Sequence, residues 1–420
     1  MNEKAPLPAA PKTRQKRKLR PDVLRLEHLG PIQKAEVSFG DLTVIVGPQA
    51  TGKSIFLQTL KLVLDRDSIH NTFKHHSVAF NGNSDAFLGG YYGKGMAAAW
   101  KEDRSKLSWN AKTYTLPELA KPSKGKQRDQ HLFFVPAQRV VSLPGGVTQN
   151  FGQFNYGDPY TLRYFSDAVH DLLQNEFGAK GTLFPQPNRL NDTLRQPIID
   201  HLFGGSTLTV DASDFTKRLV LQVPGHKEGL PYLAWSAGQR EFTPLLLGLY
   251  WLCPAGKLSK RAGIDWVVIE EPEMGLHPQG IATVLLLVLE LLRRGYKVVV
   301  STHSPVVLDL VWALQEFKQL GGTESDVRAL FNLPNKDYAK GLGRVILKKD
   351  CRVYFFDRNQ TVRDISKLDP GATDSAESEW GGLTGFASRT GETIADLVDR
   401  QAARPRRKKN TGLPNGVGAA

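Results

Sequence analysis

The sequence predicts an α/β protein built on a parallel sheet. Three short runs read as buried strands: DLTVIV at 41–46, DWVVI at 265–269 and YKVVV at 296–300. The first leads through a glycine-rich loop into IFLQTLKLVL, an apolar segment long enough to form a helix. A second predicted helix, 280–293, lies between the other two runs. Strands that alternate with helices in this way are typical of a parallel sheet covered by helices.

The loop after the first strand matches the pattern GxxxxGK[ST] in full, between a strand and a helix. Its glycines let backbone N–H groups wrap around a phosphate, and the helix N-terminus adds partial positive charge. Lys53 can reach the β- and γ-phosphate oxygens of a nucleotide, and the Ser54 hydroxyl can bind Mg²⁺. The predicted phosphate-binding residues are Gly47, Pro48, Gln49, Ala50, Thr51, Gly52, Lys53 and Ser54.

Two carboxylates follow the strand at 265–269. In a protein with a phosphate-binding loop, Glu270 is expected to hold Mg²⁺ through water, while Glu271 orients and deprotonates the attacking water. Two like charges side by side would be costly without a cation. His303 follows the strand at 296–300, at the edge where phosphate ligands bind in parallel sheets. A lone histidine is more often structural, but this position favours a role in the site.

A further anion site is predicted where a turn of small residues opens the apolar helix FTPLLLGLYWL. Ser236 can cap this helix, and a helix N-terminus attracts negative charge. Taken alone, the turn would be only a helix cap.

In this order the elements resemble the ATP-binding head of the ABC class: a Walker A loop, a degenerate signature motif (SAGQ in place of LSGGQ), a Walker B strand with an adjacent glutamate, and a switch histidine. More narrowly, LEHLGPIQKAEVSFGDLTVIVGPQATGKS, SAGQRE, EEPEMGLHP and STHSP resemble the OLD/RecF-like ATPases. This branch includes ATPase subunits of bacterial anti-phage systems. The resemblance covers roughly residues 21–310, at the motifs, and Glu270 agrees with the OLD-like pattern rather than with the commoner Asp.

The resemblance implies an ATPase that uses ATP and Mg²⁺ and works as a homodimer of heads or a larger homo-oligomer. The absence of a disulfide framework predicts a reducing, cytoplasmic compartment. ATP would lie between the Walker A loop of one subunit and the signature of the other. Ser236 and Gly238 would contact the γ-phosphate bound by the partner's Lys53, and residues 275–278 would be the D-loop that crosses the interface.

A Q-loop glutamine is also implied by the resemblance. Gln138, in HLFFVPAQR, follows a predicted strand and is the candidate to reach Mg²⁺ or the attacking water. Gln130 and Gln149 are nearby alternatives.

The predicted domain organisation is one head, residues 21–400, between two basic arms. The net charge is +13, of which residues 1–20 carry +6 and residues 401–420 carry +5, so the body is nearly neutral. Both arms are expected to be disordered. They could bind nucleic acid through counterion release, or they could serve only solubility.

Insertions decorate the predicted head, because 182 residues separate Ser54 from Ser236. The first, about 66–130, contains a hairpin and predicts an antiparallel β subdomain. The second, about 145–205, joins an aromatic loop to an amphipathic helix. This helical insertion could be a lid, a partner surface, a nucleic-acid contact or simply a packed loop. A C-terminal hairpin is expected at about 345–366, followed by weakly helical chain.

The chain lacks several features of related ATPases. There are no long heptad runs, and no carboxylate cluster typical of a Toprim nuclease; Asp65-Arg66-Asp67 reads as a solvated turn that closes the first helix. No run is long enough to span a membrane, and the two cysteines form neither a disulfide framework nor a zinc site.

The expected function is therefore a sensor or regulatory ATPase of an anti-phage defence system that acts through a separate effector, such as a Toprim or HNH nuclease. A RecF-like DNA repair ATPase is the alternative. A transporter's ATP-binding subunit is disfavoured by the degenerate signature and by the insertions.

Overall fold

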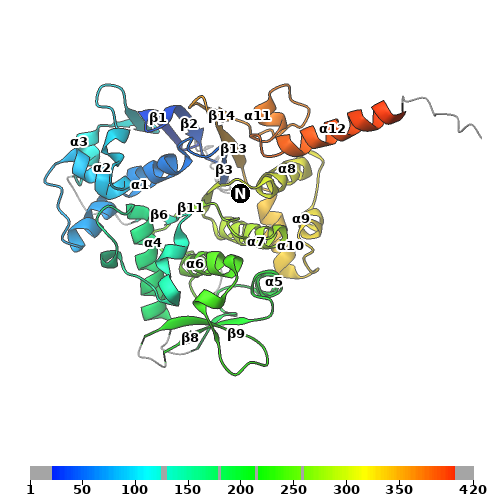
Figure 1. Ribbon diagram of the computed structural model, residues 1–420, viewed down its shortest axis with the longest axis horizontal. Helices are drawn as coiled ribbons and strands as arrows, with labels where there is room; N and C mark the ends of the chain where they lie inside the picture. The colour runs from blue at the N-terminus through cyan, green and yellow to red at the C-terminus, as the bar shows by residue number, and fades with distance from the viewer. Residues whose placement is uncertain (1–20, 124–129, 178–180, 213–215, 257–259, 403–420) are drawn as a thin grey trace, which may run out of the picture.

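The computed structural model describes residues 21–402, apart from 124–129, 178–180, 213–215 and 257–259 (Figure 1). The predicted basic arm at 1–20 and the tail from residue 403 onward lie outside the described residues. Within the described part, no helix is long and apolar enough to cross a membrane.

The centre of the molecule is a six-stranded sheet in the order β14-β13-β3-β12-β11-β6. Its strands are β3 (Leu42–Val46), β6 (Leu132–Val135), β11 (Trp266–Glu270), β12 (Lys297–Ser301), β13 (Cys351–Phe356) and β14 (Val362–Asp364). All neighbouring pairs are parallel except β13 with β14. The predicted parallel sheet is thus confirmed, and the predicted C-terminal hairpin is its edge.

Each central strand is buried on both faces, and its residues alternate between two hydrophobic cores. In β11, Val267 and Ile269 pack into one core, whereas Trp266 and Val268 pack into the other. Ile45 of β3 likewise faces the second core, away from its neighbours Val44 and Val46. The near-continuous apolar runs in the sequence follow from this double burial.

The second core lies between the central sheet and an antiparallel sheet in the order β2-β1-β4-β5. The strands are β1 (Val23–Leu29), β2 (Ile32–Ser38), β4 (Lys106–Trp109) and β5 (Lys112–Tyr114). The helices beside them are α1 (Lys53–His75), α2 (Ser84–Tyr92) and α3 (Leu116–Leu119). The antiparallel subdomain is thus confirmed, with its predicted hairpin as β4 and β5, but β1 and β2 of the same sheet precede the insertion predicted at about 66–130.

The interpretation of Asp65-Arg66-Asp67 as a solvated turn is wrong. Helix α1 continues to His75, with a kink at Asp65, which is 2% exposed. Asp65 accepts hydrogen bonds from Lys61 Nζ at 2.7 Å and from the backbone N–H of His131 at 2.6 Å. This carboxylate therefore joins α1 to the beginning of β6.

The first core holds most of the remaining helices and a second antiparallel sheet, β10-β9-β8-β7. Its strands are β7 (Gly181–Phe184), β8 (Thr207–Asp211), β9 (Arg218–Gln222) and β10 (Leu230–Pro231). This sheet lies beyond α6 at one end of the molecule (Figure 1). The helices are α4 (Tyr160–Asp171), α5 (Asp192–Ile198), α6 (Ala237–Leu252), α7 (Pro278–Arg294), α8 (Pro305–Gln319), α9 (Glu324–Leu330) and α10 (Asp337–Ile346).

The insertion predicted as helical at 145–205 is thus only partly helical. Its amphipathic helix exists as α4, which continues as a π-helical segment, Leu172–Glu176, but β7 follows it. Of the loop aromatics, Phe151 and Tyr160 are buried, whereas Tyr156 is 48% exposed. Phe151 and Tyr160 therefore belong to the packed core and are not available to stack on bases.

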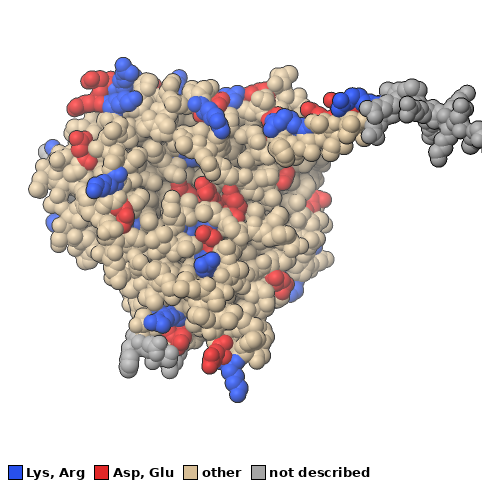
Figure 2. All heavy atoms as spheres, viewed as in Figure 1, with Lys and Arg blue, Asp and Glu red and all other residues tan. Residues whose placement is uncertain are grey.

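Beyond β14, α11 (Ser375–Ser378) is followed by α12 (Gly385–Ala402), which projects from the body (Figure 1). Lysine and arginine side chains mingle with aspartate and glutamate over the face in Figure 2, and neither sign forms a continuous patch among the described residues there. This view agrees with the nearly neutral charge of the body.

Candidate functional site

The predicted site residues meet because the parallel strands end at the same edge of the central sheet. In β11 and β12, Glu270 pairs with Ser301, and Ser301 in turn pairs with Ile45 of β3. Loops that follow different strands, and that lie far apart in the sequence, therefore lie beside the loop that follows β3. These are the loops after β6, β11, β12 and β13.

The phosphate-binding loop has a conformation that depends on its glycines. Gly47 has φ +143°, and a Cβ there would lie 2.2 Å from the carbonyl oxygen of Phe356. Gly52 has φ +93°, and a Cβ there would lie 2.7 Å from Ile32 Cγ1. Any larger residue at either position would push the loop away from β13 or from β2.

Lys53 is buried and donates hydrogen bonds to the carbonyl oxygens of Gly47 and Pro48, each at 2.7 Å. Burial lowers the pKa of Lys53, while the charges of Glu271, Glu270 and Glu273 oppose that shift. The ammonium group thus lies inside the loop, beside the acidic end of β11. Phosphate oxygens could replace the two carbonyl oxygens as its partners.

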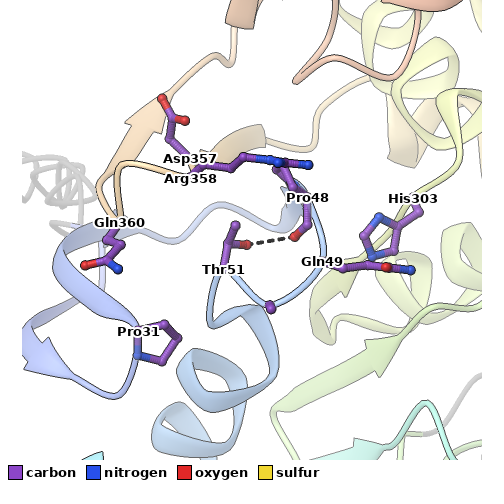
Figure 3. Close-up of a pocket in the computed structure, with 9 residues that line it drawn as sticks. Pro31, Pro48, Gln49, Thr51, His303, Asp357, Arg358 and Gln360 are labelled. Atoms are coloured by element: carbon purple, nitrogen blue, oxygen red, sulfur yellow. Dashed lines mark hydrogen bonds between the residues drawn. The ribbon is translucent and has the colours of Figure 1, made fainter.

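A cavity of about 370 Å³ opens above the loop. Its lining includes Lys53 and Ser54 from the loop, Glu271 from the end of β11, and His303 from the end of β12. A second cavity of about 580 Å³ adjoins it, because both are lined by Pro31, Gln49, Ala50, Thr51 and His303. Figure 3 shows this second cavity, which the turn after β13 also lines.

Glu270 is 3% exposed, and burial raises its pKa to about 7. Its Oε2 accepts a hydrogen bond from the Ala137 N–H at 3.3 Å, and Ser54 beside it favours the charged form. The other oxygen, Oε1, is buried and accepts no regular hydrogen bond from the described residues. A carboxylate with an unsatisfied oxygen next to a hydroxyl fits a bound Mg²⁺, which prefers oxygen ligands and keeps several waters.

Glu271 lies at the mouth of the same cavity, with its backbone in the left-handed region at φ +43°. Its Oε1 is 3.6 Å from Nε2 of His303. Burial lowers the pKa of His303, Lys53 lowers it further, and Glu271 raises it. Unlike Glu270, the Glu271 side chain is partly exposed, so its carboxylate can meet a water molecule in the cavity.

Glu273 takes part in the site although the sequence did not single it out. Its Oε1 accepts hydrogen bonds from the Thr302 hydroxyl at 2.8 Å and from the His303 N–H at 2.5 Å. It therefore fixes the loop that carries the histidine. The motif EEPE contained this residue, but nothing in the spacing showed which backbone group it would meet.

Arg139 is a second residue that the sequence did not reveal. Its side chain is completely buried and donates to the carbonyl oxygens of Glu270 at 3.1 Å, Glu271 at 3.2 Å and Glu241 at 3.1 Å. It also lies 3.8 Å from the Glu241 carboxylate. One guanidinium thus joins the loop after β6, the end of β11 and the first turns of α6.

The three candidate glutamines have different locations. Gln138 is exposed in the loop after β6, next to Ala137, whose N–H donates to Glu270. Gln130 precedes β6, at the opposite end of the strand, and donates to the carbonyl of Leu132. The carbonyl of Gln149 accepts a hydrogen bond from Ser166. Of the three, Gln138 is therefore the one at the acidic end of the sheet.

Ser236 caps α6 as predicted, in a capping box with Gln239. The turn packs against the segment 275–278, since a Cβ on Gly238 would lie 2.9 Å from the carbonyl oxygen of Gly275. Neither Ser236 nor Gly238 lines the two cavities at the loop. Within one chain, the structure therefore does not bring the signature to the phosphate-binding loop.

Comparisons with known proteins agree with this geometry. Residues 149–309 match a family described as "AAA domain, putative AbiEii toxin, Type IV TA system". This segment contains the signature, carboxylate and histidine motifs. The chain is also similar to the energy-coupling factor transporter ATP-binding protein EcfA of Methanococcus maripaludis, with 28% identity over 159 residues, which are 35% of this chain and 52% of that protein.

The matched family is described as an AAA domain and this relative as an ATP-binding protein, which agrees with the phosphate-binding loop and the carboxylates of the site. The chain spans about half the length of the curated relative that it matches.

Similar solved structures include an SMC head and an ABC transporter cassette. An SMC head bound to the C-winged helix domain of ScpA has a TM-score of 0.38 and 14% identity, over 68% of this chain and 90% of that one. A dimeric bacterial ABC transporter cassette has a TM-score of 0.33 and 11% identity, over 81% and 97%. Because these TM-scores are low, the fold is assigned from the strand order of the central sheet and from the phosphate-binding loop.

Proposed function

We propose that this ATPase is a molecular switch in which ATP hydrolysis takes place at the acidic end of β11. The observation that carries the proposal is Glu270: a buried carboxylate with one unsatisfied oxygen, beside Ser54 at the start of α1. Such a group is costly to bury unless a cation joins it. The geometry therefore supports a site for ATP together with Mg²⁺.

Each residue of the site has a proposed role in binding or in proton transfer. Lys53 and the backbone N–H groups of residues 49–54 hold the phosphates, and Ser54 and Glu270 hold Mg²⁺. The metal, when bound, offsets negative charge on the phosphates. Glu271 orients the attacking water and accepts its proton. His303, 3.6 Å from the Glu271 carboxylate, keeps that side chain beside the cavity.

We further propose that two heads complete each site. Ser236 lies exposed at the positive end of α6 and is not part of the cavity that it would serve within its own chain. A second copy placed head to tail would bring its Ser236 and Gly238 to the γ-phosphate held by Lys53 of the first. The close packing of Gly238 on Gly275 supports a common surface made of the signature turn and segment 275–278.

The biological role that we propose is regulation in a bacterial anti-phage defence system, through a separate effector such as a nuclease. The matched family, whose description names a putative toxin of a type IV toxin–antitoxin system, supports this class of role. ATP hydrolysis switches the protein between two states. This change has an effect only if another molecule binds the two states differently. The alternative, a RecF-like repair ATPase, would bind DNA directly through the basic arms.

ATP turnover and nucleotide retention test the chemistry. Glu271→Gln is expected to lower turnover by about 10²–10⁴-fold and to keep ATP bound, because only proton acceptance is removed. Lys53→Ala is expected to lose tight ATP binding. The control is Glu36→Gln, a half-exposed glutamate of β2. Wild-type turnover in Glu271→Gln would remove Glu271 from the catalytic role.

The effector is tested separately. The ATPase is purified from its native operon together with the neighbouring gene products, and nuclease activity is measured with and without ATP. We expect ATP-dependent cleavage only when a second protein is present. Cleavage by the ATPase alone, or full biological activity after deletion of every neighbouring gene, would contradict the proposal.

A further inference from the structure

We propose that the turn between β13 and β14 is the nucleoside-binding wall of the site and that the Arg358 guanidinium packs on the base of bound ATP. The inference rests on the proposed binding of ATP at residues 47–54. It adds the part of the ligand that the sequence motifs leave unassigned, since those motifs concern phosphate, metal and water.

The topology places this turn beside the phosphate-binding loop. Strand β13 runs parallel to β3, and Phe355 pairs with Val46, so the segments that follow both strands leave the sheet together. The backbone of Phe356 lies against Gly47 so closely that a Cβ would not fit between them. The cavity of about 580 Å³ is consequently lined on one side by Pro48–Thr51 and on another by Asp357, Arg358 and Gln360.

The turn is held in place from both sides. The Gln360 carbonyl accepts hydrogen bonds from the N–H groups of Gln33 at 2.8 Å and Lys34 at 3.3 Å, and the two glutamine side chains are hydrogen-bonded at 2.9 Å. On the other side, Asp357 forms an ion pair with Arg363 at 3.0 Å. The backbone that carries Arg358 is therefore fixed before any ligand binds, which lowers the entropic cost of binding.

Arg358 itself is exposed, with neither an ion pair nor a side-chain hydrogen bond to any other described residue. Figure 3 shows its side chain extending over the loop toward Pro48, while Asp357 points away and Pro31 lies on the opposite side. No carboxylate among the described residues fixes the orientation of this guanidinium, so it can turn its flat face toward a ligand. Arg358 thus presents a planar cation to the cavity.

The position of the cavity decides which part of ATP it receives. Lys53 and Ser54 line the adjoining inner cavity, so the phosphates occupy that part and the nucleoside extends outward across residues 48–51. The one aromatic ring among the described residues that line the outer cavity is that of His303, which lies on the side of Glu271, 3.6 Å from its carboxylate. A guanidinium stacks on aromatic faces, and Arg358 is the planar cation on the side of the turn after β13, where the nucleoside would extend.

The test compares ATP with inorganic tripolyphosphate, which has the phosphates but no base. Affinities for both, with Mg²⁺, are measured by calorimetry for the full chain and for Arg358→Ala, Arg358→Lys and a control, Arg344→Ala. Arg344 is an exposed arginine of α10 with a carboxylate partner, Glu324. A cation over an aromatic face contributes enough that Arg358→Ala should weaken ATP binding by roughly 2- to 30-fold and leave tripolyphosphate binding unchanged.

Arg358→Lys is expected to bind ATP with an affinity between those of wild type and Arg358→Ala, because an ammonium keeps the cation but not the planar face. Equal losses for ATP and tripolyphosphate, with rescue by lysine, would show a phosphate contact and overturn the proposal. Unchanged ATP affinity in Arg358→Ala would also overturn it. Wild type and Arg344→Ala could instead bind tripolyphosphate but not ATP, or bind neither. Either result would refute the proposed binding of ATP at residues 47–54.

Discussion

Arg139→Met offers the sharpest test of how the site is held together. Methionine has a similar length but no donor, so the substitution leaves the carbonyl oxygens of Glu270, Glu271 and Glu241 without their partner. It also leaves the Glu241 carboxylate, whose pKa burial raises, without the nearby cation. Removing one member of a buried charge pair typically costs about 3–5 kcal/mol.

We therefore expect Arg139→Met to lower the free energy of unfolding by about 3–5 kcal/mol, a large part of the total for an ordinary domain. Urea denaturation of the full chain measures this change, with Arg344→Met as the exposed control. At urea concentrations where the variant is still folded, its kcat should fall more than its KM for ATP changes, because the altered groups hold the end of β11 rather than the phosphates.

Arg139→Lys separates charge from geometry. A single ammonium cannot reach the three carbonyl oxygens that the planar guanidinium joins. The free energy of unfolding of Arg139→Lys should therefore fall between those of wild type and Arg139→Met. The reasoning is refuted if Arg139→Met unfolds within about 0.5 kcal/mol of wild type, the range of ordinary surface substitutions, and retains wild-type turnover.

Three further outcomes follow from the site and the sequence. The pKa of Glu270 is raised to about 7 in the folded chain from a usual 4.5, so the folded state binds the extra proton and loses stability as pH rises through this window. Without nucleotide and metal, Glu270→Gln should thus be more stable than wild type at pH 8 and nearly equal at pH 4.5; urea midpoints at both pH values decide. Ser236→Arg should be inactive alone and, mixed with Lys53→Ala, should regain at most half of the composite sites; turnover that persists in monomers at high dilution would contradict a shared site. Deleting residues 1–20 and 404–409 should flatten the salt dependence of nucleic-acid binding, by a slope of roughly 0.9 for each phosphate that the arms no longer neutralise, whereas an unchanged slope leaves the arms a solubilising role.

The sequence predicts the parts of the site that depend on local order along the chain. A strand, a glycine loop and a helix in succession define the phosphate site, and polar residues directly after buried strands define the acidic edge. Arg139 and Glu273 could not be found in this way. Arg139 donates to backbone groups more than 100 residues away. Every residue has a backbone carbonyl, so the sequence does not show which carbonyls a distant arginine will contact.

Asp65 shows the opposite error, in which a local pattern misled. Its spacing from Asp67 is that of a carboxylate cluster, but its place near the expected end of the helix indicated a solvated turn. In the fold, Lys61 one turn earlier and the N–H groups at the start of β6 surround it, so the charge is both buried and partnered. Whether an acidic residue is solvated depends on what packs against the helix, which is a property of the whole fold.

The sheet β7–β10 could have been anticipated from the alternation in TLTVD and RLVLQ, and it changes how the insertion should be understood. Leu208 of β8 and Leu219 of β9 share a core with Phe242 and Leu245 of α6, the helix that Ser236 caps. Phe203, just before β8, lies 5.7 Å from Phe242 between ring centres. Close-packed interiors have low compressibility and transmit strain. A partner that moves this sheet would therefore move α6 with it, and with α6 the signature turn that the proposed second head must reach.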